Sequence, residues 1–116
     1  MGGVHNLKYF PKFAVGHIVY HKIFHYRGVV FKIDFTYKGT PRSGNGFNSL
    51  DLVRPWYYIL VEDDDDSTYV SEGNLVRRPM ELPVASPFIN SFFKKFENGK
   101  YLRWDECISA EDGIHL

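Results

Sequence analysis

The chain has little cysteine and no excess charge, and each shortage excludes a class of protein. Cys107 is its single cysteine, so no internal disulfide framework can form, which fits a reducing compartment. The acidic neighbours Asp105 and Glu106 disfavour a thiolate, and we interpret Cys107 as an inert side chain. Fourteen Lys and Arg balance fourteen Asp and Glu, whereas dedicated DNA-binding proteins are usually basic overall.

Long apolar runs and catalytic motifs are also absent. No stretch approaches the roughly 20 apolar residues of a membrane span, and the N-terminus lacks the apolar run of a secretory leader. We therefore expect a cytoplasmic chain without a membrane role. No nucleophile elbow and no glycine-rich phosphate loop is present, so we predict no enzyme activity, no cofactor and no metal.

Two clusters contain residue types that commonly bind metals, and we interpret neither as a metal site. His17, His21 and His25 recur every four residues, a spacing that presents a metal-binding face on a helix. On a strand, His17 and His21 lie about 13 Å apart, too far to share a zinc ion. The four aspartates at 63–66 offer oxygen ligands for Ca²⁺ or Mg²⁺, but they lack the glycine and distant glutamate of the known calcium loop. We interpret them as a solvated hairpin tip.

Aromatic and turn-forming residues are abundant and predict a mainly all-β fold. The chain has ten Phe, eight Tyr, two Trp, ten Gly and six Pro. Alternating and β-branched patterns predict strands over 13–21, 27–35, 55–62 and 67–71, with a brief fifth strand after a turn at Gly73-Asn74. Within the second strand, Val29, Phe31 and Ile33 should share one face, and Gly28 indicates a bulge or a close backbone approach. Residues 36–54 read as a long exposed loop.

The C-terminal part carries the pattern of a helix. Ser86 is a good N-cap and Pro87 suits the first helical position, so we predict a helix over 87–97 that Gly99 closes. The apolar stripe of this helix is a candidate for docking a partner, or else for packing on its own domain; its aromatic members are Phe88, Phe92, Phe93 and Phe96. We expect a flexible arm over 1–12, a C-terminal extension over 77–107 and a disordered tail over 108–116.

Charge is distributed unevenly between the two halves. Residues 1–58 hold eight Lys and Arg against two Asp, and residues 59–116 hold six against twelve Asp and Glu. Such bipolarity suits protein partners or self-association at least as well as DNA. Basic and aromatic residues interleave in the first half, as they do on nucleic-acid-binding barrels and in protein-binding grooves. The candidates for binding DNA or a protein partner are His21, Tyr26, Arg27, Lys32, Arg54, Trp56 and Tyr57.

Ordered blocks of residues resemble a known family. The blocks are Gly16-x-x-Val19-x-His21, Tyr26-Arg27-Gly28-Val29-Val30 and Asp34, then Pro55-Trp56-Tyr57, Val61-Glu62-Asp63-Asp64 and Tyr69-Val70-x-Glu72-x-x-Leu75. Their order, with a variable loop at 36–54, is similar to the YccV-like family, the hemimethylated DNA-binding domain whose bacterial type member is the heat-shock protein HspQ. Where bacterial members often have Gln, this chain has His17. Residues 88–104 look like the extension of longer relatives, including YccV-like modules of eukaryotic F-box proteins.

The resemblance implies both a fold and a function. It implies a small SH3-like β-barrel of about five strands over 13–76, with the one C-terminal helix outside it. It implies binding to hemimethylated DNA, or modulation of an ATP-dependent protease such as Lon or Clp as an adaptor or substrate, in a heat-shock and protein-quality-control role. The alternative is a protein-interaction module of the eukaryotic type that has no DNA role. No catalysis is implied.

Overall fold

The computed structural model describes residues 10–39, 49–78 and 81–106. Most of the expected arm over 1–12, the tail over 108–116, Cys107 and the middle of the loop over 36–54 lie outside these residues. Within them the α-helices are short, α1 at Ser49–Val53 and α2 at Ile89–Phe92, and a 3₁₀ turn, η2, spans Glu72–Asn74. No helix of the described chain is long and apolar enough to cross a membrane.

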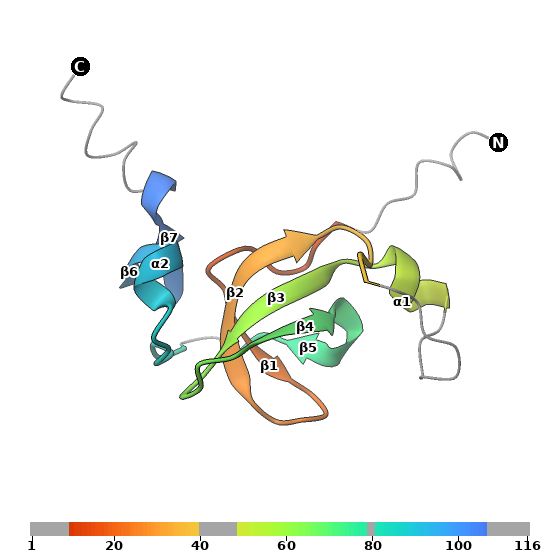
Figure 1. Cartoon of the computed structure of the whole chain (residues 1–116), viewed down its shortest axis with the longest axis horizontal. Coiled ribbons are helices and arrows are strands. Elements are labelled where there is room, and N and C mark those ends of the chain that lie inside the picture. Colours follow the sequence, from red (N-terminus) through yellow and green to blue (C-terminus); the bar gives the residue numbers. More distant parts are fainter. Residues whose placement is uncertain (1–9, 40–48, 79–80, 107–116) are drawn as a thin grey trace, which may run out of the picture.

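The centre of the fold is an antiparallel sheet with the order β4-β3-β2-β1-β5 (Figure 1). Its strands are β1 (Ile18–His21), β2 (Arg27–Asp34), β3 (Trp56–Val61), β4 (Ser67–Ser71) and β5 (Leu75–Val76). The five strands predicted from the sequence are all confirmed. The first begins later than predicted, because Gly16 takes a positive φ of 97° and breaks the extended run.

The predicted SH3-like β-barrel of about five strands is confirmed as a mainly antiparallel β fold, but the sheet is open and does not close into a barrel. Strands β4 and β5 form its two edges and are not paired with each other in the described chain. A two-residue β5 offers too short a ladder to close the sheet. The sheet is curled nonetheless, since all five strands contribute to one core cluster. The members of that cluster are Phe13, Val19, Val30, Tyr57, Ile59, Val70 and Leu75.

A β-bulge in β2 changes which face its side chains occupy. The register with β3 shifts between Val30 and Lys32, which leaves Phe31 as the extra residue. Val29 and Phe31 therefore pack on the second core cluster, whereas Ile33 joins Val30 against the first. The predicted shared face of Val29, Phe31 and Ile33 is wrong beyond the bulge, because one inserted residue reverses the alternation.

The prediction of a helix over 87–97 is wrong beyond Phe92. The chain instead forms a hairpin of β6 (Phe93–Glu97) and β7 (Lys100–Arg103), which Figure 1 places beside the sheet. Asn98 and Gly99 connect the strands with φ values of 55° and 81°, the backbone of a two-residue hairpin turn. Gly99 therefore closes a β-turn and not a helix.

The hairpin is part of the hydrophobic core. Phe93 is fully buried and Tyr101 is 4% exposed, and both belong to the second core cluster with Ile18, Val29 and Leu60. The Tyr101 hydroxyl also donates to the carbonyl of Val84 at 3.0 Å. The hairpin thus covers the sheet face opposite the first cluster, so both faces of the sheet are buried at its centre.

Candidate functional site

An uncharged aromatic groove of about 410 Å³ lies between the β1–β2 turn and the β4 edge of the sheet. Ten of the described residues line it; none of them has a carboxylate or cationic side chain, and six carry rings. These rings are His21, Phe24, Tyr26, Tyr37, Trp56 and Tyr69, and the remaining positions are Thr68, Val70, Ser71 and Asn74. We call this set the aromatic groove.

His21 shapes the turn side of the aromatic groove. Its Nδ1 accepts the backbone N–H groups of Ile23 and Phe24 at 3.1 and 3.0 Å, so its proton lies on Nε2. Burial lowers the pKa of His21, which keeps the ring neutral at pH 7. The ring contacts those of Phe24 and Tyr26 at 4.7 and 5.2 Å between centroids. The result is a fixed turn that presents Phe24 with 72% of its surface exposed.

Three packed rings form the sheet side. Trp56 stacks on Tyr69 at 5.0 Å and contacts Tyr37 at 4.7 Å. The Trp56 indole donates to the carbonyl of Asp51 in α1 at 2.7 Å, and the Tyr69 hydroxyl donates to Asp34 at 2.9 Å. Burial, helped by the hydrogen bond to Asp34, raises the pKa of Tyr69, so its hydroxyl stays a donor. These polar anchors hold the rings in place before any ligand arrives.

Cationic residues lie around the rim. The backbone N–H of Lys22 donates to the carbonyl of Asn74 at 2.8 Å, and that of Lys38 donates to the Tyr69 hydroxyl at 3.0 Å. The Arg54 guanidinium lies against Gly73, next in the chain to Asn74. Lys22 and Lys38 are exposed. The aromatic groove therefore has an uncharged aromatic floor with three cationic residues near its rim, while the carboxylates of Asp34 and Asp51 accept from the Tyr69 and Ser71 hydroxyls of its lining.

The structure brings some of the predicted binding residues together and separates others. His21, Tyr26 and Trp56 line the aromatic groove and Arg54 lies at its rim. Tyr57 is fully buried, and its hydroxyl donates to Glu72 at 2.6 Å.

Lys32 is another predicted residue outside the aromatic groove: it is exposed on the sheet face over the Tyr58 ring at 4.8 Å. Sequence reasoning missed Phe24, Tyr37 and Tyr69 as lining residues, because only the folded sheet brings their three segments together.

Arg27, another predicted binding residue, is committed to an internal clamp. Its guanidinium makes a two-point contact with Glu62 at 2.6 and 2.7 Å and reaches Glu81 at 3.0 Å. It also donates to the carbonyls of Leu82 and Pro83 at 2.8 and 2.7 Å. All five guanidinium N–H groups thus have acceptors. We assign Arg27 the role of tying the linker before α2 to the sheet.

The four predicted docking phenylalanines divide between core and surface. Phe93 is fully buried, and Phe96 packs against the second core cluster. Phe88 and Phe92 are 40% and 38% exposed, and Phe92 contacts Phe31 at 4.6 Å between ring centroids. The stripe therefore serves mainly to pack the hairpin on the sheet.

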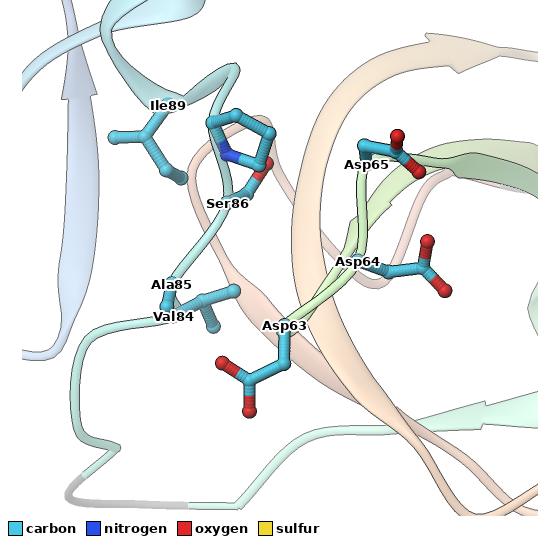
Figure 2. A pocket seen from close by; sticks show the side chains of 8 residues that line it. Asp63, Asp64, Asp65, Val84, Ala85, Ser86 and Ile89 are labelled. Carbon is cyan, nitrogen blue, oxygen red and sulfur yellow. The ribbon is translucent and has the colours of Figure 1, made fainter.

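A second cleft has an acidic wall. Figure 2 shows Asp63, Asp64 and Asp65 on one side and the linker segment 84–89 on the other. The carboxylates of Asp64, Asp65 and Asp66 come within 4.8 Å of one another and are exposed. In Figure 2 the Asp64 and Asp65 carboxylates point away from Ser86 and Ile89. Exposed acidic tips of this kind are common without an ion, and we assign no metal to this one.

One comparison with known proteins bears on this arrangement. Residues 11–100 match the family model described as hemimethylated DNA-binding protein YccV like. The match spans the whole five-stranded sheet, both walls of the aromatic groove and the chain up to the first residue of β7.

Proposed function

The chain belongs to the YccV-like family of hemimethylated DNA-binding proteins, and from this premise we propose that it is a non-enzymatic module that binds duplex DNA. The observation that carries the proposal is the aromatic groove with its rim of Lys22, Lys38 and Arg54. Aromatic rings bordered by cations are the surface that nucleic acids select, because phosphates need positive charge and bases offer apolar faces and edges.

The two parts of the surface divide the work of recognition. The rim cations contact backbone phosphates, which supplies affinity without sequence preference. The exposed Phe24 ring and the neighbouring tyrosines offer apolar and hydrogen-bonding contacts to base edges. A methyl group on a base is an apolar bump in the major groove, and an aromatic edge is a suitable contact for it. We therefore expect a preference for methylated over unmethylated sites and only modest overall affinity, because the rim holds few cations.

Binding of matched duplexes tests the proposal. Fluorescence anisotropy is measured on one sequence in unmethylated, hemimethylated and fully methylated form, with adenine N6 methylation in one series and cytosine C5 methylation in another. From the family to which the chain belongs we expect the hemimethylated duplex to bind best, with a slope of log K against log salt near −0.9 per phosphate contacted, so that the three rim cations alone contribute about −3. Absence of binding near physiological salt would overturn the proposal.

Matched substitutions test whether the aromatic groove is the surface used. Phe24→Ala should weaken binding several-fold, and Phe35→Ala should not, although Phe35 is similarly exposed at 68% and lies outside the groove. In the same way, Lys22→Ala should lower the salt slope by about 0.9 and Lys95→Ala should leave it unchanged. Equal effects within each pair would show that DNA binds elsewhere.

A protease adaptor is the second candidate function, and the position of β4 favours it. Strand β4 is an edge of the sheet beside the aromatic groove, an arrangement that suits an extended peptide whose backbone pairs with the edge and whose apolar side chains enter the groove. In this role the chain would modulate an ATP-dependent protease such as Lon or Clp in the cytoplasm during heat stress.

A pull-down from heat-stressed lysate tests the adaptor role. The wild-type chain should enrich a protease or its clients, Phe24→Ala should lose them and Phe35→Ala should keep them. Recovery of other proteins without DNA binding would favour the eukaryotic-type interaction module instead. A lysate that yields no protease with either bait would count against the adaptor role.

A further inference from the structure

A second basic cluster lies at the other end of β1, away from the aromatic groove. His17 immediately precedes β1, and Arg77 immediately follows β5. The antiparallel register pairs Tyr20 with Val76, the last residue of β5, so the chain leaves β5 at Arg77 beside the start of β1, where His17 lies.

Lys100 reaches this cluster from the C-terminal hairpin. It is the first residue of β7, and the N–H of the following residue, Tyr101, donates to the carbonyl of Gly16 at 2.9 Å. Gly16 has no side chain, and a Cβ there would overlap the Tyr101 carbonyl oxygen, so β7 can lie against the residue before His17. Three separate segments of the chain thus meet at one place.

His17 is held as a neutral hydrogen-bond donor within the cluster. Its Nδ1 accepts the backbone N–H of Ala14 at 3.0 Å, so the ring proton lies on Nε2. Burial and then the charges of Arg77 and Lys100 lower the pKa of His17 to about 4. Both cations are therefore near enough to influence the charge of the imidazole, and at pH 7 His17 is a neutral N–H donor in their vicinity.

The two cations of this cluster are unpaired with any acid of the described residues. Within residues 10–39, 49–78 and 81–106, neither Arg77 nor Lys100 forms an ion pair. Glu97 faces Lys100 across the hairpin, but its carboxylate pairs with Lys95 at 3.6 Å. A guanidinium, an ammonium and an imidazole N–H close together, with the neighbouring Glu97 carboxylate already paired to Lys95, make a receptor for an oxyanion.

We propose that His17, Arg77 and Lys100 form a phosphate-binding subsite that takes a backbone phosphate of the DNA whose bases lie at the aromatic groove. The inference rests on the proposed DNA-binding function for the identity of the ligand. The distance between the subsite and the aromatic groove suits a DNA backbone, because Arg77 is three residues from Asn74 of the groove. Three residues of extended chain span about 10 Å, close to three base-pair steps of about 3.4 Å.

The subsite is tested first without DNA, by NMR of the histidine rings of the full chain with inorganic pyrophosphate as the probe. An anion near the two cations offsets their charge, so it should raise the pKa of His17 by about half a unit or more and leave that of His21, at the other end of β1, unchanged. Arg77→Gln combined with Lys100→Gln should abolish this response, and Lys32→Gln should preserve it, because Lys32 is exposed over the Tyr58 ring and takes no part in the cluster. No response of His17 to millimolar pyrophosphate, or an equal response in the double variant, would overturn the subsite.

DNA titrations then separate this inference from the function on which it rests. The double variant should lower the salt slope by about 0.9, because the contact to one phosphate is lost, and should leave the ratio of hemimethylated to unmethylated affinity unchanged. An unchanged salt slope in the double variant would refute the subsite and leave the proposed DNA binding intact. If His17 responds to pyrophosphate but no duplex binds, the anion subsite stands and DNA binding is refuted.

Discussion

Replacement of Arg27 should destabilise the fold more than its position at the start of a strand suggests. The Arg27 side chain is only 14% exposed. It pairs with Glu62, in the turn after β3, and with Glu81, and it also donates to the carbonyls of Leu82 and Pro83. Arg27→Ala leaves both carboxylates without their cation and both carbonyls without a donor. The substitution therefore weakens the attachment of residues 81–83 to the sheet.

The size of the effect follows from burial. Removal of one partner from a buried ion pair costs about 3–5 kcal/mol, and the 28% exposure of Glu62 lets water recover part of this. We expect the free energy of unfolding to fall by about 3 kcal/mol for Arg27→Ala. For a domain of this size that corresponds to a fall in Tm of about 15 °C. Arg27→Lys keeps the charge but not the two-point contact and should cost about half as much.

Chemical denaturation followed by circular dichroism measures both variants. Glu62→Gln completes a double-mutant cycle, which should return a coupling energy above about 1 kcal/mol. Hydrogen exchange adds a local reading, because the Val84 N–H that donates to the Tyr101 hydroxyl should lose protection in Arg27→Lys. A cost below about 1 kcal/mol for Arg27→Ala would refute this account of the clamp.

Three further changes probe other parts of the fold. Gly16→Ala should cost about 2–3 kcal/mol in urea titrations, because a Cβ meets the β7 backbone at a positive φ; a neutral result would contradict the close approach. Tyr57→Phe should lower the free energy of unfolding by about 2 kcal/mol, because buried Glu72 loses a hydrogen-bond donor; an unchanged urea midpoint would argue against that bond. His17 binds its proton near pH 6.5 when unfolded and near 4 when folded, so stability should fall as pH drops through this window, by at most about 1 kcal/mol per unit. His17→Gln should reduce that slope, and the lowered pKa of His21 contributes to what remains; the same slope in wild type and variant would exclude His17 as its source.

The sheet could be predicted from sequence because its strands carry strong local signals. The runs around Val29 and Ile59 are β-branched and apolar, and Gly28 was expected at a close approach, which the neighbouring Leu60 carbonyl confirms. The bulge at Phe31 could not be predicted, because nothing local marks where an extra residue is inserted. It changes the face occupied by Ile33 without changing the strand itself.

The C-terminal hairpin was misassigned although its signal was present. Asn98-Gly99 between two short runs is a strong hairpin turn, but the spacing of Phe88, Phe92 and Phe96 also fits a helix. Tertiary packing decided the outcome, because the second core cluster needs Phe93 on an extended backbone facing the sheet. That demand comes from residues far away in the chain.

The aromatic groove could be predicted only in part. His21, Tyr26 and Trp56 stand in blocks that combine aromatic and basic residues, which is why they were candidates. Arg27 and Tyr57 share the same blocks but serve the fold, one as the clamp and one in the core. Composition cannot separate these roles, because burial and partners exist only after the sheet has formed.

The burial of the sheet on both faces defines how much chain must fold together. A fragment that ended at residue 76 would contain all five strands but would leave Ile18, Val29 and Leu60 bare on one side. Such a fragment would expose a continuous apolar surface and would tend to aggregate. The smallest cooperative folding unit therefore extends through β7, and any exchange of this module between proteins must carry the hairpin with the sheet.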